Sequence, residues 1–175
     1  MPVYEVVSLE DVKAVTCEVS CQIDKFCHLI GWYFSHIDSH QHVNLREPVH
    51  SVVVEIGRKV GIPLRHCSPT IRYCGNFYGQ TDEGSPIPDI ISVKGLLKIL
   101  AELSPGLTEL ACYQGEGDDL NTMYANERGK ELEVLCDPRV RTSIIISKLN
   151  LCSFHDAANL LITSLVSDNS IMEKR

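Results

Sequence analysis

The chain has 175 residues, of which 44% are hydrophobic and 22% are charged, as expected for a globular protein with a buried core. A formal net charge of -7 at pH 7, without any lysine-rich or arginine-rich run, excludes a typical nucleic-acid-binding surface. No apolar stretch approaches the ~18 residues that span a bilayer and no secretory signal begins the sequence, so we expect a cytoplasmic protein without a membrane span.

The first part of the chain predicts two helices with a histidine-rich strand between them. A first helix carries apolar side chains at three- and four-residue steps until Gly31 ends it. The histidine-rich strand follows around residues 34–39. A second helix begins at Pro48 and ends at Gly61, and residues 62–67 are expected to form a short strand.

The next part predicts a long loop followed by alternating helices and strands. Residues 68–91 are rich in Gly, Pro, Asp and Ser, and a loop of this length often closes over a ligand or binds one. A third helix begins at Ser92, and a strand covers residues 107–112. A loop over residues 113–121 leads to a fourth helix over residues 124–136.

The last part predicts a buried strand over residues 143–147, a final helix over 154–167 and a polar tail over 167–175. Alternating helices and strands indicate an α/β fold with a mostly parallel sheet, in a single domain covering residues 1–175. Functional groups of such folds gather at the carboxyl ends of the strands, which directs attention to the loops after them.

Histidine and aspartate alternate in the strand between the first two helices, as His36, Asp38, His40 and His42. On an extended strand these four side chains would project from one face. Imidazole and carboxylate groups bind divalent metals and exchange protons near neutral pH, so the pattern favours a metal or catalytic site. A solvated strand face would show the same alternation. Alternate Cβ atoms lie ~7 Å apart, so one or two of the four would bind an ion and the others would orient ligands or exchange protons.

Polar and aromatic residues also mark the long loop. Arg65, His66 and Arg72 flank it and could hold a polar or anionic ligand, or could simply be solvated. Its aromatic side chains could pack against a sugar ring or against the protein itself: Tyr73, Phe77 and Tyr78. The eight cysteines include no Cys-x-x-Cys pair, so we expect free thiols in a reducing compartment.

Several segments together resemble one known family. The run His36-Ile37-Asp38-Ser39-His40-Gln41-His42-Val43 resembles the signature of the YdjC-like carbohydrate deacetylases, which include chitooligosaccharide deacetylases and hopanoid-associated proteins. Further similar segments follow in the same order, at residues 61–65, 75–80, 106–112 and 135–141. The resemblance runs from about residue 8 to residue 156.

The resemblance implies a partial (β/α) barrel-like fold and the hydrolysis of N-acetyl groups on sugars or oligosaccharides. It also implies a divalent metal, magnesium or zinc, that would polarise the amide carbonyl and activate a water. The family's metal-binding histidine of the Asp-Ser-His step corresponds to His40. Asp38 and His42 match neighbouring positions that support the metal or the substrate, and Arg72 is a further expected substrate-binding residue.

The chain departs from the family pattern in three places. The family's N-terminal strands, which carry an Asn-Ala-Asp-Asp-Phe-Gly motif and further ligands, precede the matched region. Tyr113 replaces the histidine of a Cys-His-Pro-Gly motif, and Asn44 replaces the last histidine of the histidine-rich run. Two hypotheses follow: a deacetylase whose other ligands lie outside this sequence, or a non-catalytic remnant that binds carbohydrate or another partner. Without the first strands a sheet edge would be exposed, and we expect homo-oligomers to form through it.

Overall fold

The computed structural model describes residues 10–31, 34–81, 83–116 and 123–157. The chain divides into two compact units, with residues 1–70 and 152–175 in unit 1 and residues 71–151 in unit 2. Each unit has its own hydrophobic core. The single domain expected over the whole chain stays a prediction. None of the helices in the described ranges is both long enough and apolar enough to cross a membrane.

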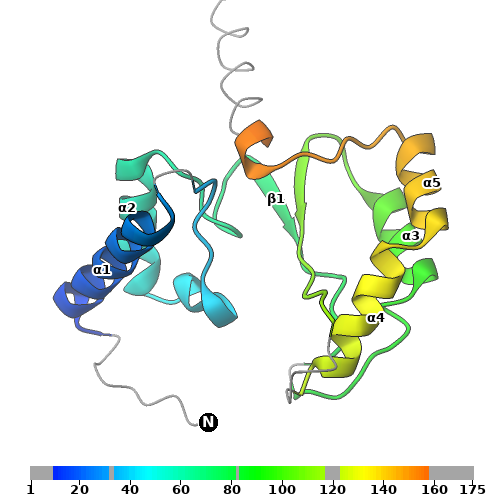
Figure 1. Cartoon of the computed structure of the whole chain (residues 1–175), viewed down its shortest axis with the longest axis horizontal. Helices are drawn as coiled ribbons and strands as arrows, with labels where there is room; N and C mark the ends of the chain where they lie inside the picture. The colour runs from blue at the N-terminus through cyan, green and yellow to red at the C-terminus, as the bar shows by residue number, and fades with distance from the viewer. Residues whose placement is uncertain (1–9, 32–33, 82, 117–122, 158–175) are drawn as a thin grey trace, which may run out of the picture. The chain divides into compact units, whose positions relative to one another are not determined.

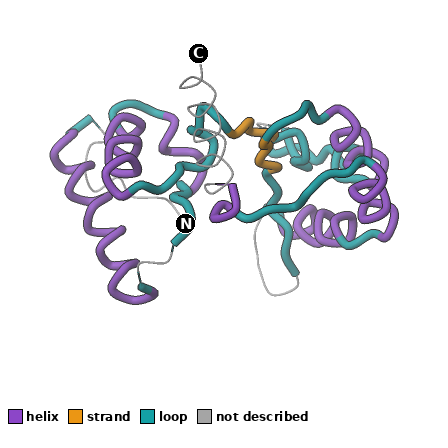
Figure 2. The backbone as a smooth tube through the Cα atoms, turned by 90° about the horizontal axis from the view of Figure 1, so that it is seen from above, coloured by secondary structure: helices purple, strands orange, loops and turns teal. Residues whose placement is uncertain are grey.

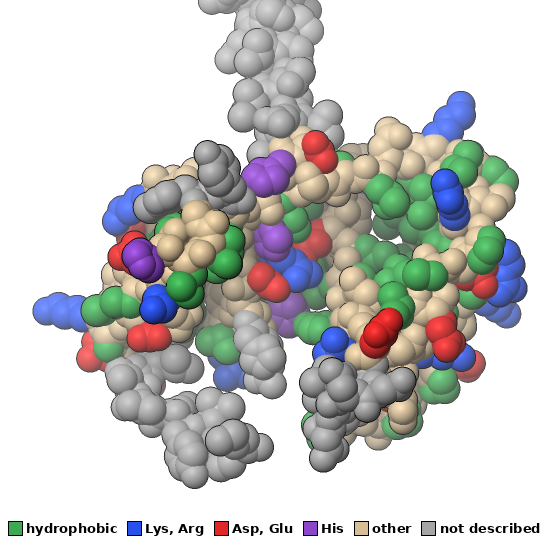
Figure 3. All heavy atoms as spheres, viewed as in Figure 1, with side chains coloured by type: hydrophobic (Ala, Val, Ile, Leu, Met, Phe, Trp, Pro, Cys, Tyr) green, Lys and Arg blue, Asp and Glu red, His purple; other side chains and the backbone are tan. Residues whose placement is uncertain are grey.

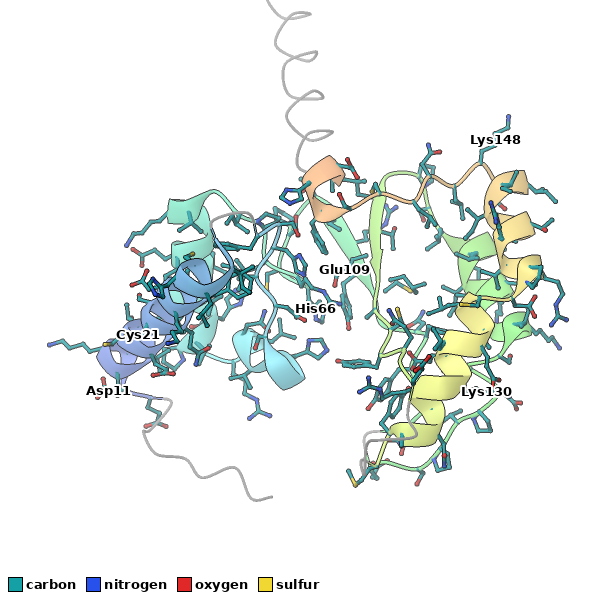
Figure 4. All side chains as sticks on the ribbon, in the orientation of Figure 1. Asp11, Cys21, His66, Glu109, Lys130 and Lys148 are labelled. Carbon is teal, nitrogen blue, oxygen red and sulfur yellow. The ribbon has the colours of Figure 1, made fainter. Side chains whose placement is uncertain are left out.

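Unit 1 is built on two helices, α1 (Val12–Ile30) and α2 (Val49–Val60), as the apolar periodicity predicts. Asp11 caps α1, because its Oδ1 accepts hydrogen bonds from the backbone N–H groups of Lys13 and Ala14, both at 3.0 Å (Figure 4). Gly61 ends α2 with a φ of 71°, a left-handed conformation that glycine adopts without strain. The core between these helices consists of Val15, Val49, Val52, Val53 and Leu64.

The prediction of a histidine-rich strand is wrong. Only one parallel bridge forms there, between Ile37 and Leu64, and the predicted strand over 62–67 is reduced to the same bridge. From His40 to Leu45 the chain instead forms the 3-10 helix η1. His40 and His42 therefore do not alternate with Asp38 along one strand face, because a 3-10 helix turns about 120° per residue.

Over its described residues, unit 2 contains a two-stranded parallel sheet and three helices (Figure 1). Strand β1 (Ile71–Cys74) pairs with β2 (Leu107–Leu110), in a register that runs from Ile71 opposite Leu107 to Cys74 opposite Leu110. Helix α3 (Val93–Glu102) begins at its cap Ser92, and α4 (Ala125–Leu135) follows the second loop. Figures 1 and 2 show these helices on one side of the strands, together with α5 (Pro138–Ile146). The core consists of Phe77, Ile91, Leu96, Leu100, Val134 and Val140.

Three expectations for unit 2 and the chain end need correction or stay open. The predicted strand over residues 143–147 is wrong, because α5 covers most of it. The predicted loop over 68–91 contains β1. The final helix begins at residue 154 and is helical to 157, and the rest of it, with the tail over 167–175, lies outside the described residues. The described residues thus form a mixed α/β structure with a small parallel sheet, which confirms the fold class in its general form.

Candidate functional site

The histidine-rich segment meets a distant segment within unit 1. The N–H of Ile37 donates to the Pro63 carbonyl at 2.9 Å, and the N–H of Arg65 donates to the Ile37 carbonyl at 3.0 Å. These two bonds place residues 38–44 beside residues 65–67. We call the resulting polar group the histidine cluster; its members are Asp38, His42, Asn44, Arg65, His66 and Cys67.

Asp38 forms the charged side of the histidine cluster. Its Oδ2 accepts a hydrogen bond from Arg65 Nη1 at 2.8 Å, and its Oδ1 accepts one from the N–H of Ser39 at 2.8 Å. The Asp38 side chain is 50% exposed and that of Arg65 is 25% exposed, so water weakens this ion pair. Each carboxylate oxygen keeps a further lone pair, so Asp38 can still accept a bond from a ligand.

Two imidazoles adjoin each other in the histidine cluster. The rings of His42 and His66 meet edge to face, with centroids 5.3 Å apart and planes at 81°. Both residues have left-handed backbone conformations, with φ of 54° at His42 and 60° at His66. Such conformations cost about 1 kcal/mol or more for residues other than glycine, and strained residues of this kind cluster at functional sites.

Asn44 ties the histidine cluster together from within the protein. Its side chain is buried, and Nδ2 donates to Cys67 Sγ at 3.3 Å. Its own N–H donates to Ser39 Oγ at 3.1 Å, and its carbonyl oxygen lies 3.1 Å from His50 Nδ1. Asn44 therefore has a structural role at the position where the family pattern has a histidine.

The remaining predicted site residues are not all placed in this cluster. His40 begins η1, but its side chain lies outside what the structure describes. The His36 ring stacks on Phe154 with centroids 4.4 Å apart. Arg72 belongs to unit 2, where its Nη2 donates to the carbonyls of Ser104 at 2.5 Å and Pro105 at 2.8 Å. The described part of the chain offers no group of three or more His, Cys, Asp or Glu residues that could hold a metal ion.

A second constellation, in unit 2, joins the segments that follow the two strands. Tyr78 follows β1, Tyr113 follows β2, and Tyr124 precedes α4; we call these three residues the tyrosine cluster. Tyr78 and Tyr124 stack with centroids 4.8 Å apart and planes at 8°. Tyr113 meets the edge of each ring, at 5.6 Å from Tyr78 and 6.2 Å from Tyr124. The cluster thus lies where α/β folds commonly bind ligands.

Glu131 of α4 anchors the tyrosine cluster. It is completely buried, with Oε2 accepting the N–H of Tyr113 at 2.5 Å and Oε1 accepting the Tyr124 hydroxyl at 2.5 Å. Burial raises the pKa of Glu131, while the two hydrogen bonds and nearby Arg128 oppose that rise. Burial and the bond to Glu131 also raise the pKa of the Tyr124 hydroxyl, whose oxygen accepts the N–H of Gly79 at 2.6 Å.

Sequence reasoning singles out Tyr78 and Tyr113 separately but misses Tyr124 and Glu131. One signal is available for Glu131, because it lies three residues before the buried Val134 on α4. A helix places residues at that spacing on the same face, so an acid there is directed toward the core.

Comparisons with known proteins identify a family and several relatives of this chain. Residues 3–145 match the family described as YdjC-like protein. A carbohydrate deacetylase from Clostridium beijerinckii is 28% identical over 163 residues, and the match covers 85% of this chain and 62% of that protein. A chitooligosaccharide deacetylase from Yersinia pestis is 25% identical over 162 residues, covering 83% of this chain and 62% of that protein.

A solved structure shows the same fold. It comes from Enterococcus faecalis V583, is described as a candidate cellobiose-phosphate cleavage protein, and is 24% identical with a TM-score of 0.66. The match covers 87% of this chain and 62% of that chain. This chain therefore spans about 62% of the length of each of these three proteins.

Proposed function

Because the chain belongs to the YdjC-like protein family, we propose that it acts on N-acetylated sugars as a metal-dependent carbohydrate deacetylase. The reaction is hydrolysis of the N-acetyl amide, which releases acetate and leaves an amine on the sugar. We further infer that β1 and β2 belong to a partial (β/α) barrel-like sheet.

The observation that carries the proposal is the packing of the Asp-Ser-His step against residues 65–67. Two distant segments meet in unit 1 through two pairs, Asp38 with Arg65 and His42 with His66. Carboxylate and imidazole groups bind metals and exchange protons. Two relatives that match over more than four fifths of this chain are named as sugar deacetylases, which supports the substrate class.

The donor chemistry suits a divalent ion, magnesium or zinc, but the described residues do not complete a metal site. We propose His40 as one metal ligand, with Asp38 and His42 beside it holding substrate or orienting ligands. Two or three more donors are needed for a usual zinc site, and they would come from outside the described residues.

A second candidate function is non-catalytic sugar binding. Two observations favour it, both at positions where the family pattern has histidine. Asn44 is buried and bonded to Cys67, and Tyr113 is part of an aromatic cluster. The imidazoles of the family pattern are therefore replaced at these two positions by an amide and a phenol ring, groups that could still contact a sugar.

Acetate release from N,N'-diacetylchitobiose tests the deacetylase proposal. The full chain is assayed with added zinc or magnesium, as wild type and as His40→Ala. We expect the substitution to reduce acetate release at least about 100-fold, because it removes a direct metal ligand. Zinc binding measured by isothermal titration calorimetry should weaken in the same variant.

His28→Ala is the matched control, because His28 is an exposed histidine on α1 and lies outside the histidine cluster. It should release acetate like the wild type. Equal background release by the wild type and His40→Ala would contradict the deacetylase proposal and favour non-catalytic binding.

A further inference from the structure

We propose that the tyrosine cluster of unit 2 is a sugar-ring stacking site, in which a pyranose packs against Tyr78 and Tyr113. The choice of a sugar as ligand rests on the proposed function, whereas the site itself stands on the geometry of unit 2. The segments bearing these two tyrosines leave the carboxyl ends of β1 and β2, which are parallel neighbours. Both segments therefore start at the same end of the sheet, where the strands finish.

The two outer tyrosines are partly exposed. Tyr78 is 39% exposed and Tyr113 is 47% exposed, although both make ring contacts within the cluster. Large aromatic side chains so exposed retain apolar surface that a ligand can cover. The C–H groups on one face of a pyranose provide a flat apolar surface for that purpose, and its hydroxyl groups stay at the rim.

The rings are held before any ligand binds. Glu131 fixes the backbone of Tyr113 and the hydroxyl of Tyr124, and Tyr124 stacks beneath Tyr78. Burying a carboxyl group is costly unless it is fully hydrogen-bonded, and here both oxygens are engaged. Rings that are already ordered lose little conformational entropy on binding, so a modest contact area can give measurable affinity.

Polar side chains lie next to the rings. Gln80 follows Tyr78 closely in sequence, and its Nε2 donates to Glu127 Oε1 at 3.2 Å and to the Met123 carbonyl at 2.9 Å. Glu127 lies three residues after Tyr124, a spacing that brings side chains together on a helix. Amide and carboxylate groups beside aromatic rings are the donors and acceptors that sugar hydroxyls use.

Arg128 completes the surroundings of the cluster. Its guanidinium packs so closely against Gly115 that a Cβ at position 115 would collide with Nη2. The N–H of Gly115 also donates to the Arg128 carbonyl at 3.3 Å. The segment that carries Tyr113 is therefore fixed to α4 at two points, through Glu131 and through Arg128.

Binding of N-acetylated chitotetraose to the full chain tests the proposal. Isothermal titration calorimetry is performed with a chelator present, so that metal binding does not contribute. We expect Tyr113→Ala and Tyr78→Ala each to raise the Kd about tenfold, and Tyr113→Phe, which keeps the ring, to leave it near the wild-type value. Tyr113→Leu serves as a second variant, because it keeps apolar volume without an aromatic face.

Two controls separate this inference from the deacetylase proposal. Phe26→Ala removes a 45% exposed aromatic ring of α1 in unit 1 and should not change the Kd, and His40→Ala, also in unit 1, should not change it either. Absence of binding by the wild type, or an unchanged Kd in folded Tyr78 and Tyr113 variants, would overturn the stacking site without bearing on acetate release. Tyrosine-dependent binding without any acetate release would support the stacking site and contradict only the deacetylase proposal.

Discussion

Glu131 has an unusual environment for a glutamate. It is fully buried on α4, and its two oxygens accept hydrogen bonds from different parts of unit 2. One bond reaches the segment after β2 through Tyr113, and the other reaches Tyr124 at the start of α4. Removing the carboxyl group would leave a partly buried N–H and hydroxyl without their acceptor, which costs more than losing a bond at the surface.

We expect Glu131→Ala to lower the free energy of unfolding by about 3–5 kcal/mol, through a cavity and two lost hydrogen bonds. Glu131→Gln fills the same space but presents an amide hydrogen where a donor already points, so a loss of about 1–2 kcal/mol is expected. Urea unfolding at neutral pH measures both values. Glu133→Gln, at an exposed position of the same helix, is the control and should change stability by less than about 0.5 kcal/mol.

The raised pKa of Glu131 also predicts a pH dependence. Its principal cause is burial, so the folded protein holds the proton at a higher pH than the unfolded chain does. The stability contributed by this group is therefore full below the usual glutamate pKa and declines as pH rises through the raised folded pKa. The stability difference between the wild type and Glu131→Gln should shrink from acidic to neutral pH. A difference that grows over this interval would contradict the assignment.

The residues of the candidate site show what local pattern cannot provide. The Asp-Ser-His step is evident from sequence because the chemistry of its side chains is independent of conformation. The geometry of this step cannot be predicted from sequence. The contact between His42 and His66 depends on two left-handed backbone conformations, which residue type does not reveal. The bond from Asn44 to Cys67 likewise joins residues 23 positions apart.

At the scale of elements, the two wrong strands have separate causes. Around Ile37, Ser35 and Ser39 share the face of the apolar side chain, whereas a half-buried strand needs one largely apolar face. Only the single bridge to Leu64 forms there. In α5, Asp137 caps the helix through the N–H of Arg139 and Pro138 occupies its first turn, which are strong helix-start signals. The three isoleucines of residues 144–146 therefore continue the helix instead of forming a buried strand. Two of them are largely exposed, Ile145 at 66% and Ile146 at 74%.

The helices with regular apolar spacing are predicted well. Periodicity locates α1, α2 and α3, because a helix that buries one face must repeat apolar residues every three or four positions. Helix α4 lies within the predicted range 124–136. Caps at Ser92 and Gly61 also appear as expected. Strand pairing is less accessible to prediction, because each strand has only four residues and its partner is distant in sequence.

Two helical glycines differ in the space around them, and we predict opposite effects on stability when each is replaced by alanine. Gly95 of α3 is so close to the carbonyl of Ile90 that an added Cβ would collide with the backbone, whereas a Cβ at Gly129 of α4 meets nothing within 4 Å. Gly95→Ala should lower the free energy of unfolding by about 1–3 kcal/mol, because backbone cannot move aside cheaply. Gly129→Ala should raise it by about 0.5–1 kcal/mol, because alanine favours the helix.

Thermal and urea unfolding of the two glycine variants measure these opposite shifts. Since both substitutions are chemically identical and both lie in helices of unit 2, helix propensity alone predicts the same sign for each. Equal stabilisation by Gly95→Ala and Gly129→Ala would show that α3 has more room beside Ile90 than the structure gives it.

At the scale of the whole molecule, two cores replace the continuous sheet that alternating helices and strands suggest. The core of unit 1 lies between α1 and α2, and that of unit 2 lies among α3, α4, α5 and Phe77. Local periodicity predicts helical members of both cores, because each helix buries the side that its own sequence marks as apolar. It does not predict their division into two units, since that depends on packing between segments far apart in sequence.

The described surface predicts self-association of the chain. The sheet of unit 2 has two strands, so β1 and β2 each have one edge without a ladder partner among the described residues. An open parallel edge can accept another strand. Apolar side chains also reach the surface (Figure 3), including Ile30 at 71% and Ile146 at 74% exposure, and covering them is favourable.

Sedimentation velocity over a range of concentrations tests this association. We expect the weight-average mass to exceed that of the monomer and to rise with concentration. Ile146→Lys should lower it, because a charge on α5 opposes apolar contact, whereas Lys130→Arg, at an exposed position of α4, should leave it unchanged (Figure 4). If Ile146→Lys has no effect while the wild type associates, the contact uses another surface, with the strand edge as the first alternative. A wild-type chain that stays monomeric throughout would show that neither the edge nor the apolar side chains drive association.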